Sequence, residues 1–405
     1  MHWSSSPEHR AVFTAHERER RWERIRQGMD AVGLDLLVVL PQWLIDDALY
    51  VANQSGAVVF PLTGEPTLII GGEGSNVATA AEGWIANRRS ATARGSTRVP
   101  YGEAVAACLE ELKMPPGARV GVAGLGASHL VHVRQPEGYV NYSTVMRIRE
   151  AIPQCTLVDG TSVLAEARHQ KSEEELEVMR RSVRVAEASA AAIAEHARGG
   201  ALQADVFGQG ILAQMREGAE EQSLSWCAGR WGEMKWRYTS PPPGEIAADS
   251  WYILTEIGPS VRGYNSQISE PFVVGRMDPQ TSEVWELNAA AFTRACALMK
   301  SGATWDAVEE GVKEVGRGSG YEIDFLIHGR GLGNEGPMLI PVDTHEPFKG
   351  MPLKEGSTFV LKPFAYPPGS RYVARQHDVT WGDTIVVRRD GAERLGTRPL
   401  KLVEA

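Results

Sequence analysis

Glu256 and Gln267, eleven residues apart, are the first pair of side chains whose spacing could serve chemistry. They lie in the stretch YILTEIGPSVRGYNSQISEPF, where two β-type runs flank a Gly-Tyr pair, so the sequence predicts a hairpin carrying both positions. Two carboxylates at this spacing are typical of a hydrolase metal site. Gln267 has no charge and offers only an amide carbonyl, so metal binding depends on what other residues contribute.

Four more residues could take part in acid/base or electrostatic chemistry. His328 lies in HGRGLG, and an imidazole titrates near neutral pH, which suits general acid/base catalysis; the alternative is a histidine that only supports the fold. Glu335 follows as a possible base, or as a solvated or helix-capping residue. Lys362, in EGSTFVLKPFAY, could act as a base, a nucleophile or a clamp for an anion. His377 lies in ARQHDVTWGD, where its charged neighbours also fit a surface cluster.

Aromatic residues are concentrated around one segment of the C-terminal half. Trp236, Tyr238 and Trp381 are candidates for a substrate wall, because aromatic rings bind cations and exclude water. Trp226, Trp231 and Trp236 recur at steps of five, which places consecutive members on opposite faces of a strand. At most two of these three can share one wall, and core packing is expected to account for the others.

The first 165 residues predict an α/β domain. Residues 14–33 have helical periodicity, 34–40 read as a buried strand, and 56–62 with 66–72 read as a hairpin. A helix at 102–113 and a strand at 119–125 continue the alternation. The glycines of GVAGLG lack the order of a dinucleotide-binding loop.

Residues 166–405 predict a second domain in which helices mix with antiparallel strands. A long helix begins at a capping box formed by Ser172 and Glu175, and ends near the pair Gly199–Gly200. Further helices are expected at 204–218, 280–299 and 304–317. The fold class is therefore α/β in the broad, α+β sense, with two domains.

Four ordered segments resemble the C-terminal, pitta-bread domain of the creatinase/prolidase/methionine-aminopeptidase family, and residues 1–165 resemble its smaller N-terminal domain. The segments are RHQKSEEELEVMRRS, EIGPSVRGYNSQISEPF, HGRGLGNEGP, and EGSTFVLKPFAY taken together with VTWGDTIVVRRDGAERL. In that family two Asp, one His and two Glu hold two metal ions. The resemblance places these positions, in order, on Glu256, Gln267, His328, Lys362 and Gly382.

These substitutions predict a site without metal or other cofactor. A glycine offers no side-chain ligand, and the ammonium of Lys362 is a cation with no lone pair to donate. We expect Lys362 to form an ion pair with Glu256 where the ions would lie, and Gln267 to bridge by hydrogen bonds. Glu270, where the family usually has Arg, continues the reversed charge pattern.

The resemblance has two further consequences. The segment CAGRWGEMKWRYTSPPP has no His, and the position of the family's catalytic histidine falls near Trp236. In the family, the N-terminal domain of a partner subunit often closes the site. A homodimer is therefore expected, with Trp43, Asp46 and Asp47 in the closing loop.

Composition argues against several classes of partner. A net charge of −9 argues against binding to a nucleic-acid backbone. The chain has no apolar run long enough for a membrane span and its start lacks a signal peptide, and its four cysteines are scattered, so a cytoplasmic protein is expected.

The function predicted is metal-independent hydrolysis of a C–N bond in a small, carboxylate-bearing molecule, by acid/base chemistry with Lys362 in place of the metal charge. Two alternatives remain open: a lyase or isomerase that abstracts a proton, and a binding module without catalysis.

Overall fold

The computed structural model of the chain forms two compact units. It describes residues 13–41, 47–71, 83–92, 100–130, 137–237, 240, 243–339, 350–367 and 377–405. The N-terminal unit comprises Ala11–His169 together with Leu332–Gly336, and the C-terminal unit comprises Gln170–Gly331 and Pro337–Ala405. The units thus change after His169, whereas the sequence predicted a boundary after residue 165.

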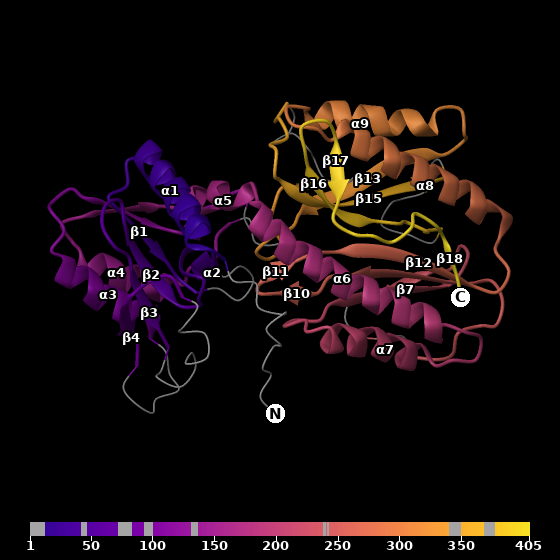
Figure 1. Cartoon of the computed structure of the whole chain (residues 1–405), viewed down its shortest axis with the longest axis horizontal. Helices are drawn as coiled ribbons and strands as arrows, with labels where there is room; N and C mark the ends of the chain where they lie inside the picture. The colour runs from indigo at the N-terminus through magenta and orange to yellow at the C-terminus, as the bar shows by residue number, and fades with distance from the viewer. Residues whose placement is uncertain are drawn as a thin grey trace. The chain divides into compact units, whose positions relative to one another are not determined.

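The N-terminal unit is built on a six-stranded sheet with the order β4-β3-β2-β1-β5-β6 (Figure 1). The strands are β1 (Leu36–Val39), β2 (Ala57–Pro61), β3 (Thr67–Ile70), β4 (Asn87–Ser90), β5 (Arg119–Val122) and β6 (Thr156–Asp159). The predicted hairpin is present, because β2 pairs antiparallel with β3. β1 pairs antiparallel with β2 and parallel with β5.

Helices cover both faces of this sheet, because alternate strand residues are apolar on each side. The helices are α1 (Ala15–Val32), α2 (Asp47–Ala52), α3 (Tyr101–Leu112), α4 (Tyr142–Ala151) and α5 (Thr161–His169). One face packs Val38 and Val120 against Val105 of α3 and Ile148 of α4. On the other face, Phe60 meets Trp22 of α1 edge-on, with ring centroids 5.7 Å apart.

The C-terminal unit contains two five-stranded sheets, in the orders β18-β12-β9-β7-β8 and β14-β13-β15-β16-β17, and a short ribbon β10-β11. Strands of the first sheet and the ribbon are β7 (Leu224–Arg230), β8 (Lys235–Arg237), β9 (Trp251–Ile257), β10 (Ser260–Val261), β11 (Tyr264–Asn265), β12 (Ile268–Val274) and β18 (Val403–Glu404). Strands of the second are β13 (Glu322–Gly329), β14 (Met338–Leu339), β15 (Thr358–Tyr366), β16 (Asp383–Val387) and β17 (Ala392–Arg394). The predicted mixture of helices and antiparallel strands is confirmed.

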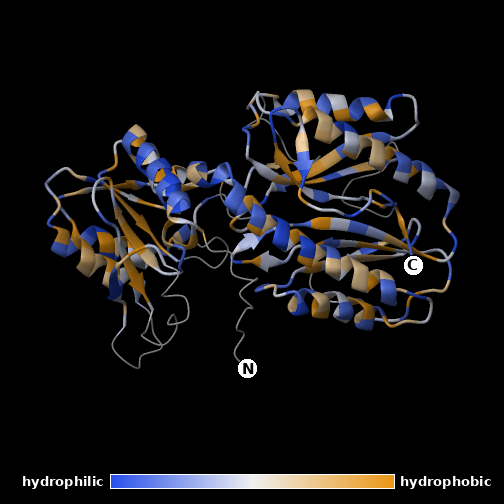
Figure 2. Cartoon of the chain, in the orientation of Figure 1, coloured by the Kyte–Doolittle hydropathy of each residue, from blue (hydrophilic) through white to orange (hydrophobic). Residues whose placement is uncertain are grey.

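Among the described residues of this unit, the α-helices that accompany these sheets are α6 (Glu173–His196), α7 (Gln203–Arg216), α8 (Pro279–Leu298) and α9 (Trp305–Lys313). The capping box predicted at Ser172 and Glu175 is formed. Figure 1 shows α6 and α7 along the first sheet and α8 and α9 along the second. Figure 2 shows that the strands are more apolar than the helices, whose polar residues repeat along one side.

A backbone bridge joins the two sheets of the C-terminal unit. Ser269 of β12 and Gly382, just before β16, exchange two N–H···O bonds of 3.0 Å. This bridge brings the hairpin β9-β12 beside β15 and β16, which are distant in sequence. The candidate chemistry of both segments therefore meets at the junction of the sheets.

The described parts of the chain contain all four cysteines. The four cysteines, Cys108, Cys155, Cys227 and Cys296, are free thiols. In these same parts, no helix has the length and apolar character needed to span a bilayer.

Candidate functional site

The predicted ion pair between Glu256 and Lys362 is present at the junction of the two sheets. Lys362 Nζ lies 2.8 Å from Glu256 Oε1. The Lys362 side chain is only 2% exposed, whereas that of Glu256 is 16% exposed. The carboxylate therefore stabilises a nearly buried ammonium, while retaining a path to solvent.

Gly382 makes room for the stem of this lysine. A Cβ placed at Gly382 would lie 2.6 Å from Lys362 Cγ and 2.8 Å from the carbonyl oxygen of Leu361. No real Cβ tolerates contacts this short, and the carbonyl is fixed in β15 by the pairing with β13 and β16. The observed position of the Lys362 side chain therefore requires that residue 382 have no side chain.

Gln267 bonds to a guanidinium that the sequence interpretation did not use. Its Oε1 accepts a hydrogen bond from Arg330 Nη2, and the same nitrogen lies 3.4 Å from His328 Nε2. His328 Nδ1 lies 3.1 Å from the Gly329 carbonyl oxygen. Gln267, His328 and Arg330 are 5–7% exposed. Gln267 thus bridges by a hydrogen bond, as predicted, but its partner is Arg330.

Arg330 was missed although the motif HGRGLG was recognised. The signal available was a charged residue placed between two glycines, two positions after His328. β13 carries His328 into the site, and Arg330 follows it with its N–H bonded to the Thr358 carbonyl of β15. The orientation of its side chain depends on this pairing, which sequence spacing does not reveal.

Glu270 is paired with an arginine from the C-terminal segment. Arg398 Nη1 contacts Glu270 Oε2, and its Nη2 donates to the Gly382 carbonyl at 2.8 Å. Burial raises the pKa of Glu270 to about 7, and the Arg398 guanidinium opposes this shift. Burial likewise raises the pKa of Asp383, which Arg398 and Arg394 oppose. Arg398 thus links the C-terminal segment both to the Glu270 carboxylate and to the backbone of Gly382, which lies beside Lys362.

Glu335 belongs to the N-terminal unit by its contacts. Its Oε1 accepts the N–H of Leu332 at 2.9 Å and lies 3.7 Å from Arg168 Nε. Arg168 also pairs with Asp47, whose Oδ2 accepts from the Tyr139 hydroxyl at 2.9 Å. Glu335, Arg168 and Asp47 are all at least 97% buried. The contacts of Glu335 and Asp47 are those of structural anchors, so Glu335 is not solvated, whereas a role of Asp47 in closing a partner's site stays a prediction.

The structure separates the two tryptophan candidates. Trp236 of β8 pairs with Cys227, which pairs with Leu254, so the register places it on the face of the sheet that carries Glu256. Its role as a substrate wall stays a prediction. Trp381 is 1% exposed and meets Phe292 of α8 edge-on at 4.9 Å. The prediction for Trp381 is wrong, because the ring fills the apolar core and gives nothing to a substrate.

His377 is not brought together with Glu256. Its ring packs on Trp231 at 5.3 Å, and Trp231 in turn packs on Tyr252 at 5.1 Å. Tyr252 lies four residues before Glu256 on β9, roughly 13 Å along the strand. Tyr238, Trp43 and Asp46 lie outside the described residues.

The three tryptophans of this segment lie on two faces of the first sheet. Trp226 is fully buried on the face of α7 and donates to Gln203 at 3.2 Å. Trp231 and Trp236 pack on the apolar core of the opposite face, which contains Cys227 and Leu254. At most two of the three tryptophans thus share a wall, as expected, but the step of five does not separate Trp231 from Trp236, because Trp231 lies in the turn between β7 and β8.

Metal-ligating residues do not gather in the described parts of either unit. No group of three or more His, Cys, Asp and Glu side chains with the geometry to hold an ion occurs there. Among the described residues at the sheet junction, Glu256 contributes a carboxylate to these contacts, Lys362 an ammonium and Arg330 a guanidinium. Gln267 contributes an amide and His328 an imidazole.

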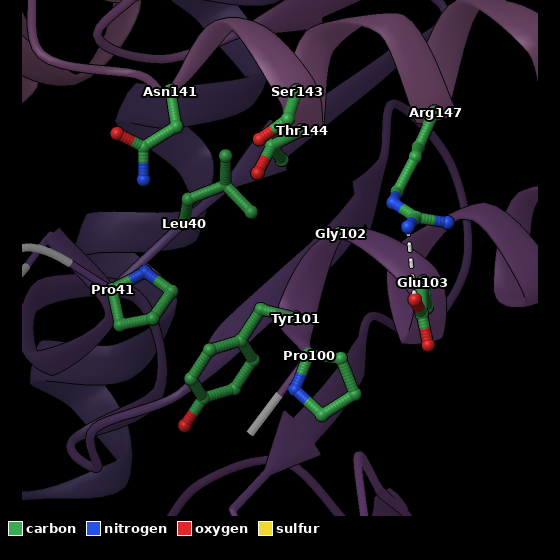
Figure 3. Close-up of a pocket in the computed structure, with 10 residues that line it drawn as sticks. All are labelled: Leu40, Pro41, Pro100, Tyr101, Gly102, Glu103, Asn141, Ser143, Thr144 and Arg147. Atoms are coloured by element: carbon green, nitrogen blue, oxygen red, sulfur yellow. Dashed lines mark ion pairs between the residues drawn. The ribbon is translucent and has the colours of Figure 1, made fainter. Parts of the chain in front are cut away.

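The N-terminal unit has a separate cavity of about 320 Å³ at the first turns of α3 and α4 (Figure 3). Arg147 and Glu103 form a 3.0 Å ion pair at one side of it (Figure 3). Both side chains are about half exposed, so the pair neutralises its own charge at the surface.

Comparisons with known proteins agree with this architecture. The model of metallopeptidase family M24 matches residues 177–389. An Xaa-Pro dipeptidase of Pyrococcus furiosus is 24% identical over 269 residues, which cover 64% of this chain and 72% of that one. A creatinase of a Bacillus species is 21% identical over 272 residues, 62% of this chain and 63% of that one. The solved structure of an Xaa-Pro dipeptidase from Bacillus anthracis is similar in fold, with a TM-score of 0.74 at 19% identity, over 96% of this chain and all of that one.

Proposed function

The chain belongs to metallopeptidase family M24, and from this premise we propose that it is a hydrolase that cleaves a C–N bond in a small, carboxylate-bearing molecule without a metal ion. The relatives named Xaa-Pro dipeptidase and creatinase support hydrolysis as the class of reaction. The observation that carries metal independence is the Glu256–Lys362 ion pair, 2.8 Å long, at the position that the family uses for ions.

The side chains at this position do not fit two divalent ions. Such ions require anionic oxygen or imidazole ligands to balance about four positive charges. Here one carboxylate is already paired with an ammonium, Gln267 is neutral and bonded to a guanidinium, and Gly382 has no side chain. The chemistry is therefore derived from the side chains alone.

Glu256 is the group best placed to act as the general base. Among Glu256, Lys362 and His328 it is the most exposed, at 16%, so a water molecule can reach its carboxylate. In the proposed reaction Glu256 takes a proton from water as the oxygen bonds to the carbon of the C–N group. The electron pair of the C=O or C=N bond moves onto its heteroatom, and the Lys362 ammonium stabilises the charge that develops.

The second step returns the proton. The tetrahedral intermediate collapses, the C–N bond breaks, and Glu256 delivers the proton to the leaving nitrogen. His328 was the first candidate from sequence for acid/base catalysis. Its nitrogens face the Gly329 carbonyl and the Arg330 guanidinium, so the proposed reaction assigns the proton transfer to Glu256.

The proposal is tested by measuring amine release from a panel of N-acyl and amidino amino acids, with protein treated with chelator. We expect turnover to survive chelation and to fall at least about a hundredfold in Glu256→Gln and Lys362→Met. A matched control is Gln280→Glu, a surface change in the same unit. Turnover that requires added Mn²⁺ or Zn²⁺ would contradict metal independence.

A non-catalytic binding role is the second candidate, because one observation favours it. Lys362, Gln267, His328 and Arg330 are all at least 93% buried and bond to one another or to Glu256. A site so filled by its own side chains could hold a partner without turnover. Binding of panel members, with no product under any condition, would favour this candidate; an unsaturated product would instead indicate a lyase.

We also propose a homodimer, on the resemblance to creatinase and prolidase. Light scattering coupled to size-exclusion chromatography is expected to give about twice the 44.2 kDa chain mass. A monomer over the concentration range of the activity assay would refute this.

A further inference from the structure

Two cations, not one, occupy the position where the family holds two ions. Lys362 was identified from the sequence, and its ammonium lies on Glu256. Arg330 is the second: a single nitrogen of its guanidinium, Nη2, contacts both Gln267 Oε1 and His328 Nε2. The family resemblance places metal ligands at both of these positions, and each of the two side chains has an atom that can accept a hydrogen bond.

All five ligand positions of the family are thereby accounted for by contacts of two side-chain cations. Glu256 meets the ammonium, Gln267 and His328 meet the guanidinium, position 362 supplies the ammonium itself, and Gly382 lies against the Lys362 stem. A divalent ion between Gln267 and His328 would have to displace Arg330 Nη2, because the nitrogen already takes both acceptors.

The same contacts fix the hydrogen positions of His328. A carbonyl oxygen only accepts hydrogen bonds, so the nitrogen facing the Gly329 carbonyl, Nδ1, must carry the hydrogen. A guanidinium only donates, so Nε2, which faces Arg330, must present its lone pair. His328 is therefore held as the neutral Nδ1–H tautomer.

We infer that Arg330 is a second internal cation that takes the place of a divalent ion between Gln267 and His328, and that it acts as a positioning residue for His328. This inference rests on the proposed metal-independent function, since it explains how the second ion of the family is replaced. It assigns Arg330 no contact with substrate.

The first test compares two multiple variants that differ only at residue 330. Gln267→Asp with Lys362→Glu restores two carboxylates beside Glu256 and His328, and a second protein adds Arg330→Met. Titration calorimetry with Mn²⁺ is expected to show affinity more than about tenfold higher when Arg330 is absent, because a fixed cation repels the ion. Arg276→Met, at a side chain 82% exposed, is the control in the same background. Equal Mn²⁺ affinity with and without Arg330 would overturn the inference.

The second test needs no folded multiple variant. Nitrogen-15 NMR of the wild-type protein at pH 8, with the His328 signals assigned through His328→Gln, is expected to show Nδ1 protonated and Nε2 unprotonated. An Nε2–H tautomer would refute the contact. Neither measurement uses a substrate, so an absence of hydrolysis would count against the proposed function alone.

Discussion

Replacing Lys362 by Met should destabilise the C-terminal unit chiefly through Glu256. The Met side chain keeps most of the apolar stem that lies over Gly382, so the substitution removes little but the charge. Removing one partner of a buried ion pair costs about 3–5 kcal/mol, because the other charge stays buried. Glu256 retains 16% exposure and keeps part of its hydration, so we expect a cost at or just below the lower end of this range, about 2–3 kcal/mol.

A double-mutant cycle measures this effect by itself. Urea denaturation followed by tryptophan fluorescence gives the free energy of unfolding of the wild type, Lys362→Met, Glu256→Gln and the double variant. We expect the double variant to be more stable than Lys362→Met, with a coupling of about 2 kcal/mol, because it leaves no unpaired charge. If the two single effects simply add, the ion pair contributes nothing and the reasoning that Lys362 balances Glu256 is wrong.

Three other perturbations test the surroundings of the site and the N-terminal unit. Gly382→Ala should lower the unfolding free energy by about 2 kcal/mol in the same assay, because its Cβ meets the fixed Leu361 carbonyl. The control is Gly208→Ala in α7, which has open space around it and should raise the unfolding free energy by about 0.5–1 kcal/mol. Equal effects at the two glycines would contradict the steric argument. Burial raises the pKa of Glu270 in the folded state to about 7, against 4.5 for an ordinary Glu. Between these pH values the folded state binds more protons than the unfolded state, so the free energy of unfolding falls as pH rises. This residue should account for a loss of up to about 3 kcal/mol between pH 4.5 and pH 7. Stability measured across this pH range should therefore fall less in Glu270→Gln, and an unchanged slope would refute the shift. Arg168→Met should cost the N-terminal unit about 3–5 kcal/mol in thermal unfolding, because Asp47 and Glu335 are both buried, whereas Arg147→Met, at an exposed pair, should change it by less than about 1 kcal/mol.

Local patterns in the sequence predicted most of the secondary structure. The capping box at Ser172 and Glu175, the hairpin β2-β3 and the long helices follow from short-range spacing, which depends on the period of each element. Helices α4 and α5 and strand β6 were not predicted, because they are short and weakly periodic. The core position of Trp381 was also missed, since composition near a motif does not show which side chains are buried.

By itself, the sequence determined which chemical groups are present at the site. The family motifs placed Lys362 and Gly382 at two of the metal-ligand positions. The opposite charges of Lys362 and Glu256 were sufficient to predict an ion pair between them. Only the tertiary structure decided which side chains contact one another where the two sheets of the C-terminal unit meet. Gln267 and Arg330 are 63 residues apart, and their contact exists because β12 and the end of β13 converge at the junction beside Gly382. The assignment of Glu335 to the anchor around Arg168 likewise follows from three-dimensional packing, since no spacing along the chain relates residues 47, 168 and 335.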